Sequence, residues 1–252
     1  MLEGSIQTWD ERRNVIIPGD AGQTIDFAAE HWINSAKRTI QRRGKFAVAL
    51  SGGSTPKAIY QMLLAKHRTS IDWNKVWLFW SDERAVSPTS PESNYKMAME
   101  NGFSQLPIPP GQVFRMKAET SIDQGASDYA DILQRELGKE LFDLIMLGCG
   151  EDGHTASLFP NTSALQETAK LVVSNHIPET EQYRMTLTFP CIQQSRESVI
   201  IAIGSSKQAI VSVALRAAIS SPFPVSKIGE EGHKALWILD RSAAHLLYAQ
   251  HS

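Results

Sequence analysis

Short apolar segments alternate with longer amphipathic segments along most of this chain, and this alternation limits the fold more than any other feature. Phe46-Ala-Val-Ala-Leu50 and Val76-Trp-Leu-Phe-Trp80 are continuous apolar runs, which are typical of strands covered on both faces. Between residues 20 and 43, apolar side chains recur at helical spacing, and Gly44 is expected to end that helix. Alternation of this kind predicts an α/β fold with a largely parallel central sheet and helices on both of its faces.

The same patterns predict the remaining elements of the chain. Helices are expected over residues 56–66, 93–101, 121–139 and 206–219, and strands over 142–147, 171–174, 185–189, 199–203 and 235–239. No repeat, low-complexity segment or linker divides the sequence, so we expect a single domain over residues 1–252.

Composition excludes several classes of function. The formal net charge of the 252-residue chain is −2, and its basic residues are dispersed among acidic ones, so no nucleic-acid partner is expected. No apolar run is long enough to cross a bilayer, so no membrane partner is expected either. The two cysteines, Cys149 and Cys191, have no metal-type or redox-type spacing and fit a reducing compartment. We therefore expect a cytoplasmic protein.

Ligands of open α/β sheets bind beyond the carboxyl ends of the strands, and polar motifs follow four of the expected strands. The first motif is a glycine-containing turn in which Thr55 suits an N-cap and Pro56 suits the first helical turn. A helix N-terminus at such a turn favours a phosphate, although a well-capped structural turn would look the same. The absence of a P-loop lysine disfavours an ATPase or a kinase. The candidate phosphate-binding residues are Ser51, Gly52, Gly53, Ser54 and Thr55.

The second motif, Ser81-Asp82-Glu83-Arg84, leaves the end of the strand at Trp80. These charges could form a solvated loop. At the carboxyl end of a strand, however, Asp82 could hold a hydroxylated substrate while Arg84 places positive charge near a developing oxyanion. The sequence leaves open whether Glu83 faces the site or solvent.

The third motif has the glycine spacing of a dinucleotide fingerprint, in Gly148, Gly150 and Gly153. Glu151 and Asp152 would place two negative charges where a pyrophosphate should lie, and Pro160 leaves too little room for the usual crossover helix. We therefore reject the dinucleotide interpretation.

What remains in this motif is a histidine, His154, at a glycine-rich strand exit beside the carboxylate of Asp152. An imidazole titrates near neutral pH, and a neighbouring acid can orient it, so His154 suits a general base. Cys149 ends an apolar strand and is interpreted as buried packing. One histidine with two adjacent acids is an incomplete ligand set, so no metal site and no metal cofactor are expected.

The fourth motif is a pair of cations. Lys207 falls in the first turn of an expected helix, where it opposes the helix dipole, and an anionic ligand would explain its position. Arg184 opens the strand Arg184-Met-Thr-Leu-Thr-Phe189, and a surface role is an equally good interpretation on the sequence alone.

Four segments together resemble those of 6-phosphogluconolactonases in order and approximate spacing. They are Leu50-Ser-Gly-Gly-Ser-Thr-Pro56, Ser81-Asp-Glu-Arg84, Asp152-Gly-His-Thr-Ala-Ser-Leu-Phe-Pro160 and Arg184-Met-Thr-Leu-Thr188, and the resemblance runs from about residue 15 to residue 245. It implies a Rossmann-like, three-layer α/β/α fold with a mostly parallel central sheet, shared with sugar-phosphate isomerases and CoA-transferases. It also implies metal-independent hydrolysis of a phosphosugar lactone, 6-phosphoglucono-δ-lactone, without a cofactor.

By position, the resemblance suggests a role for each candidate. His154 would activate water with Asp152 nearby, Arg84 would stabilise negative charge, and Asp82 would contact the sugar. Residues 51–55, Arg184 and Lys207 would form the phosphate pocket. The protein would be a monomer or a small homo-oligomer.

Two alternatives remain beside this interpretation. The related glucosamine-6-phosphate deaminases or isomerases carry Asn-Glu-Pro where this chain has Leu158-Phe159-Pro160, and the missing acid argues against aldose–ketose chemistry. A non-catalytic sugar-phosphate sensor could use the same phosphate pocket, but it would have no need for His154, Asp152 and Arg84.

Overall fold

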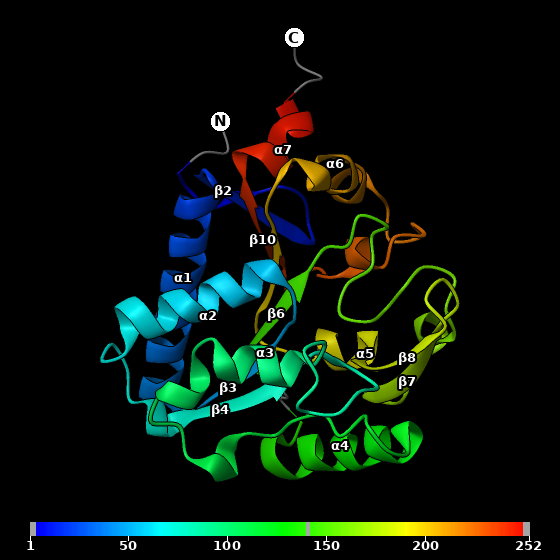
Figure 1. Ribbon diagram of the computed structural model, residues 1–252. Helices are drawn as coiled ribbons and strands as arrows, with labels where there is room; N and C mark the ends of the chain where they lie inside the picture. Colours follow the sequence, from blue (N-terminus) through cyan, green and yellow to red (C-terminus); the bar gives the residue numbers. More distant parts are fainter. Residues whose placement is uncertain (1–3, 140–141, 249–252) are drawn as a thin grey trace.

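The computed structural model describes residues 4–139 and 142–248 and contains two sheets flanked by helices (Figure 1). The larger sheet has seven strands in the order β1-β2-β10-β9-β6-β3-β4, and only the β1–β2 pair is antiparallel. Its strands are β1 (Gln7–Thr8), β2 (Arg13–Gly19), β3 (Phe46–Leu50), β4 (Val76–Trp80), β6 (Leu144–Gly148), β9 (Ser198–Ala202) and β10 (Ala235–Asp240). The predicted three-layer α/β/α fold with a mostly parallel central sheet is confirmed.

The described helices are α1 (Ala21–Arg43), α2 (Ser54–His67), α3 (Asn94–Glu100), α4 (Ile122–Leu137), α5 (Phe189–Gln193), α6 (Gln208–Arg216) and α7 (Arg241–Tyr248). The helices α1, α2, α3, α4 and α6 correspond to predicted ones. The strands β1 and β2 and the helices α5 and α7 were not predicted, and α5 begins where the sequence predicted the end of a strand. Gly44 ends α1 in the left-handed conformation with φ of 76°, as expected. Within the two described ranges, no helix has the length and apolar character that a membrane span requires.

Every side chain of β3 is buried, as are most of those on β4 and β6, so the middle of the sheet forms the core. Strands buried on both faces need apolar residues at consecutive positions, which explains why their sequences show no alternation. A cluster of aromatic side chains packs between α1 and the sheet, where Trp32 meets Phe46 edge-on and stacks on Trp73.

The second sheet was not foreseen. It has three antiparallel strands in the order β5-β8-β7, which are β5 (Asp82–Arg84), β8 (Gln182–Leu187) and β7 (Val172–Ile177). A short turn joins β7 to β8, so the two can pair only as an antiparallel hairpin. A solvated loop was one interpretation of Ser81 to Arg84, but Asp82 to Arg84 pair with β8 and form an edge of this sheet.

The start of α2 also differs from the prediction. Thr55 is not the N-cap and Pro56 is not the first helical residue, because α2 begins at Ser54 with Gly53 as its N-cap. Gly53 has φ of 106°, a conformation that suits glycine, and it offers no side chain to cap the helix. The first N–H groups of α2 therefore have no side-chain cap and lack an intrahelical acceptor.

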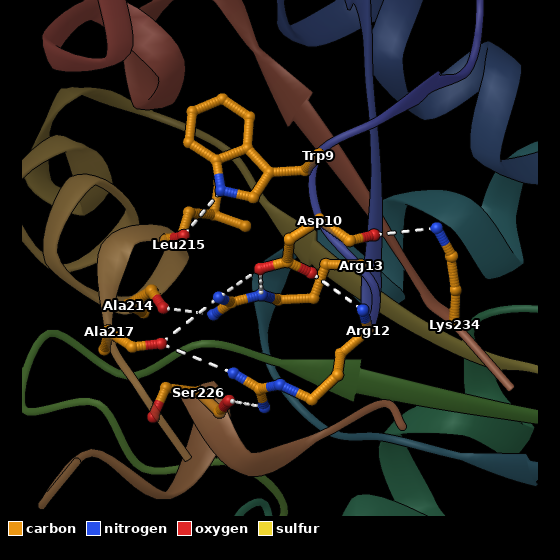
Figure 2. A network of polar contacts seen from close by, with 9 residues as sticks. All are labelled: Trp9, Asp10, Arg12, Arg13, Ala214, Leu215, Ala217, Ser226 and Lys234. Carbon is orange, nitrogen blue, oxygen red and sulfur yellow. Dashed lines mark hydrogen bonds and ion pairs between the residues drawn. The ribbon is translucent and has the colours of Figure 1, made fainter. Parts of the chain in front are cut away.

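The C-terminal end of α6 is held by residues from the start of the chain (Figure 2). The guanidinium group of Arg13 donates to the carbonyl oxygen of Ala214 at 2.6 Å, and the indole of Trp9 donates to that of Leu215 at 2.5 Å. Arg12 donates to the carbonyl oxygen of Ser226 at 3.0 Å. Cations satisfy the unpaired carbonyls of a helix C-terminus and oppose its negative dipole end, so this network fixes α6, whose other end leads back to Lys207.

Arg13→Gln is expected to lower the free energy of unfolding by about 2 kcal/mol, because it breaks a partly buried ion pair with Asp10 and removes a charged donor from the carbonyl oxygens of Ala214 and Ala217. Burial acts to raise the pKa of Asp10, but Arg13 and the backbone N–H of Arg12 outweigh it and hold this pKa below its usual value. The stabilisation is therefore present above the unfolded-state pKa and is lost as the pH falls through the folded-state pKa.

Urea denaturation of the variant and the wild type between pH 7 and pH 3 measures both effects. Arg42→Gln, on an exposed side chain of α1, is the matched control and should change stability by less than about 0.5 kcal/mol. Equal stability of Arg13→Gln and Arg42→Gln at pH 7 would contradict this account of the network.

Candidate functional site

A cavity of about 250 Å³ lies where four parallel strands of the large sheet end. Strands β3, β4, β6 and β9 are neighbours or near neighbours in register, so the segments that follow them emerge together. The lining includes the predicted residues Ser51, Gly52, Gly53, Ser54, Thr55, Asp82, Arg84, His154, Arg184 and Lys207. The structure thus brings together every predicted site residue except Asp152, which contacts His154 from outside the lining.

His154 and Asp152 form a hydrogen-bonded pair. The imidazole Nδ1 lies 2.6 Å from Oδ1 of Asp152, and the same oxygen accepts the backbone N–H of His154 at 3.1 Å. Burial acts to raise the pKa of Asp152, but these two hydrogen bonds outweigh it, so this pKa lies below its usual value and the carboxylate is ionised. Since Nδ1 is engaged, Nε2 is the ring nitrogen left to exchange a proton with a ligand.

Two neighbours fix the plane of this imidazole. The ring of Phe159 stacks on it, with ring centroids 4.1 Å apart and 19° between the planes. The ring also approaches Gly150 so closely that a Cβ there would overlap both the imidazole and the carboxylate of Asp152. Position 150 therefore requires a glycine because His154 and Asp152 lie so close to it. This contact, and not a dinucleotide fingerprint, accounts for the glycine. Phe159 was not identified as a site residue, although its aromatic side chain five residues after His154 is visible in the sequence.

The local structure after β6 differs from the strand–turn–helix arrangement of a dinucleotide site. After β6, residues 149–162 form turns, and a short 3₁₀ helix begins only at Ser163. No α-helix follows this strand to receive a pyrophosphate. Cys149 is 6% exposed, and burial raises the pKa of its thiol to about 12, so it stays protonated at neutral pH.

Asp82 is a buried carboxylate at the floor of the cavity. It is 6% exposed, and its Oδ2 accepts the hydroxyl of Ser157 at 2.6 Å. The amide of Asn94 donates to its Oδ1 at 3.2 Å and to its backbone oxygen at 2.9 Å. Asn94 also lines the cavity and packs so tightly against Gly52 that a Cβ at Gly52 would overlap it. Asn94 was missed because only its place at the start of a helix distinguishes it in the sequence.

Arg84 and Arg184 face each other across the small sheet. They are paired residues of β5 and β8, and both line the cavity. Their hydrogen bonds go to neutral oxygens: Arg84 donates to the carbonyl of Glu92, and Arg184 donates to the side-chain oxygen of Gln182 at 3.1 Å. The Nε–H of each is buried without a partner. Burial, together with the charge of Arg84, lowers the pKa of Arg184.

Two like charges on opposed strands destabilise a sheet unless something else compensates them. Among the residues that the structure describes, no carboxylate lies within ion-pair distance of either guanidinium. An anion in the cavity would supply both the missing charge and acceptors for the two orphaned N–H groups.

The turn between β3 and α2 forms another wall of the cavity. Tyr60 holds this turn by donating to the carbonyl oxygen of Ser51 at 2.8 Å and accepting its N–H at 3.1 Å. The hydroxyl of Ser51 is buried and has no partner. Lys207 ends a 3₁₀ turn that leads into α6, and its ammonium group lies 3.9 Å from the exposed carboxylate of Glu151. An orphaned hydroxyl, an uncapped helix N-terminus and a lysine suit a phosphate.

Glu83 faces neither the cavity nor solvent. It is 3% exposed, and its carboxylate accepts the backbone N–H groups of Asn94 and Tyr95 at 2.8 Å and the hydroxyl of Ser93 at 3.0 Å. Desolvation raises its pKa despite these hydrogen bonds. Glu83 therefore caps α3 and fixes Asn94, whose amide contacts Asp82.

Over residues 4–139 and 142–248, no group of three or more histidine, cysteine or acidic side chains could hold a metal ion.

The chain is similar to proteins of known family and structure. The family model of glucosamine-6-phosphate isomerases/6-phosphogluconolactonase matches residues 19–237. The 6-phosphogluconolactonase of Chlamydia pneumoniae is 43% identical over 217 residues, covering 85% of this chain and 83% of that protein. The solved 6-phosphogluconolactonase of Trypanosoma cruzi has a TM-score of 0.84 at 25% identity and covers 96% of this chain and 99% of its own. A monomeric glucosamine-6-phosphate deaminase, with a TM-score of 0.78 at 23% identity over 92% of this chain and 98% of its own, shares the fold.

Cys149 and Cys191 are expected to be unreactive in the native protein. Both are buried, and burial raises the pKa of each thiol, so almost no thiolate is present at pH 7. Titration with an aromatic disulfide reagent should detect no rapidly reacting thiol in the folded protein and two thiols after denaturation in guanidinium chloride. A thiol at Cys149 that reacts within seconds at pH 7 would contradict this, because it would require an accessible thiolate.

Proposed function

The chain belongs to the family of glucosamine-6-phosphate isomerases and 6-phosphogluconolactonases, and we propose that it is the lactonase, hydrolysing 6-phosphoglucono-δ-lactone to 6-phosphogluconate in the oxidative pentose phosphate pathway. One observation carries the proposal: the Asp152–His154 pair abuts a cavity whose other walls hold Arg84, Arg184 and Lys207. A base and an excess of positive charge suit a neutral lactone ring that carries a phosphate.

His154 acts as the general base. With Nδ1 bonded to Asp152, Nε2 takes a proton from water as the water oxygen attacks the lactone carbonyl carbon. The carbonyl oxygen becomes an oxyanion, which the guanidinium group of Arg84 stabilises. The ring C–O bond then breaks, and the departing ring oxygen takes the proton from His154, which leaves a carboxylic acid that ionises to 6-phosphogluconate. Asp152 stabilises the transient imidazolium.

The remaining residues hold the substrate. The Ser51–Thr55 turn, Arg184 and Lys207 bind the phosphate, and Asp82 accepts hydrogen bonds from sugar hydroxyls. This binding orients the carbonyl against the base, so that affinity for the phosphate is converted into rate. A δ-lactone is an activated ester, and therefore one base and one source of oxyanion stabilisation suffice without a serine or cysteine nucleophile.

The deaminase alternative is disfavoured by the surroundings of His154. The face of its imidazole is covered by the Phe159 ring, whereas aldose–ketose chemistry at this place calls for a second acid. A sensor that binds sugar phosphates without turnover would not need an ionised carboxylate against Nδ1 of His154.

We further propose that residues 1–252 act as one cytoplasmic domain, a monomer or small homo-oligomer, which needs no cofactor and binds no nucleic acid.

The direct test follows 6-phosphogluconate formation from freshly prepared lactone, with spontaneous hydrolysis subtracted. The proposal expects a rate that rises in proportion to enzyme concentration. Binding of 6-phosphogluconate without turnover would instead support the sensor, and release of ammonia from glucosamine 6-phosphate would support the deaminase.

His154→Ala is expected to lower kcat by about 10²- to 10⁴-fold, because the general base is lost, while the affinity for 6-phosphogluconate changes little. Steady-state kinetics and calorimetric titration with the product measure the two quantities. Lys207→Ala is the matched comparison at the phosphate end, where affinity should fall and kcat at saturation should change less. Normal turnover by His154→Ala would show that the base lies elsewhere.

A further inference from the structure

Asp82 is an unusual carboxylate for a sugar site because its hydrogen bonds come from neutral groups alone. Ser157 provides the shortest of them, at 2.6 Å to Oδ2, and Asn94 and Ser81 donate to Oδ1 at 3.2 and 3.4 Å. Among the described residues no cation makes an ion pair with this carboxylate. Its direction in the cavity therefore depends on these hydroxyl and amide donors, chiefly on Ser157.

Ser157 is itself rigidly held. It is 0% exposed, and its backbone N–H donates to the hydroxyl of Thr186 at 3.1 Å while its carbonyl oxygen accepts the amide of Asn175 at 2.9 Å. Thr186 lies directly opposite Asp82 in the register of β5 and β8. The serine is thus anchored to the small sheet at the place where Asp82 leaves it.

Ser157 is not among the residues that line the cavity, and its hydroxyl donates to Asp82. It does, however, belong to the tight turn that follows His154, in which the N–H of Leu158 donates to the carbonyl oxygen of Thr155 at 2.9 Å. One residue therefore joins the turn that carries the base to the strand that carries Asp82. A hydroxyl that donates to a buried carboxylate fixes the rotamer of that carboxylate.

On the premise of the proposed lactonase function, we propose that Ser157 is a positioning residue for the sugar end of the site. Its hydroxyl fixes the rotamer of the Asp82 carboxylate through Oδ2, and the contacts of Asn94 and Ser81 with Oδ1, at 3.2 and 3.4 Å, are longer, so the carboxylate can still accept a hydroxyl of the substrate. Ser157 thereby sets the distance between the group that binds the ring and the base that activates water. It takes no part in binding the phosphate.

The test is a double-mutant cycle in product affinity, which can be measured even in variants without turnover. Ser157→Ala should weaken binding of 6-phosphogluconate by about tenfold or more, because it removes a hydrogen bond to a charged group. Asp82→Ala should weaken it by at least as much. In the Asp82→Ala background, Ser157→Ala should then have almost no further effect, because the group that it positions is gone.

Two controls separate positioning from general damage. Affinity for inorganic phosphate should be the same in the wild type and Ser157→Ala, since phosphate occupies only the far end of the cavity. Thr162→Val removes another buried hydroxyl of the same network, which accepts the amide of Asn175 at 2.9 Å, without touching Asp82. It should lower thermal stability about as much as Ser157→Ala and leave product affinity unchanged.

The outcomes are distinct. If Ser157→Ala weakens product binding equally with and without Asp82, or weakens phosphate binding as much, the serine is merely structural and the inference is wrong. Wild-type affinity in Ser157→Ala also overturns it. If the wild-type protein does not bind 6-phosphogluconate at all, the proposed function itself fails.

Discussion

The site depends on the parallel register of the central sheet. Residues Phe46 to Leu50 of β3 pair in sequence with Val76 to Trp80 of β4, and β6 pairs with both β3 and β9. Strands paired in this way end at one edge, so the segments after Leu50, Trp80, Gly148 and Ala202 meet there. A change of register at any of these pairs would move one wall of the cavity, because successive side chains of a strand point to opposite faces.

This frame brings two guanidinium groups and several buried polar groups without a protein partner together at the cavity. Arg84 and Arg184 oppose each other, and their buried Nε–H groups, like the hydroxyl of Ser51, lack partners. Each such group costs on the order of 1–3 kcal/mol when it is left unpaired. Functional sites commonly retain this kind of local instability, and the surrounding core must compensate for it. Networks such as that of Arg12 and Arg13 at the end of α6 contribute to this compensation (Figure 2).

Local patterns in the sequence predicted much of the fold. The buried strands β3 and β4 have the predicted bounds, and Gly44 ends α1 as expected, because apolar runs and glycine punctuation act over a few residues. The small sheet was missed because β5 pairs with β8 about a hundred residues away, and no local pattern reports such a partner. The start of α2 was misplaced for another reason: Gly53 begins the helix through its backbone conformation, so Thr55 has no capping role.

In the site, too, contacts between residues close in sequence could be predicted and contacts between distant residues could not. His154 and Asp152 are two residues apart in sequence, so their pairing could be anticipated, and their position after a strand indicated chemistry. The side chains that hold Asp82 in place could not be anticipated. Ser157 and Asn94 reach Asp82 from 75 and 12 residues away, and Glu83 turns inward to cap α3. Sequence reasoning identifies the groups that do chemistry more readily than those that hold them in place.

The central claim is that the cavity binds a phosphosugar with its phosphate at the Ser51–Thr55 turn and its reacting carbon at His154. A crystal structure with 6-phosphogluconate bound tests this most directly. The account predicts phosphate oxygens in contact with the turn, Arg184 and Lys207, and the product carboxylate within hydrogen-bond distance of Nε2 of His154. A product bound in the reverse direction, or bound outside this cavity, would contradict it.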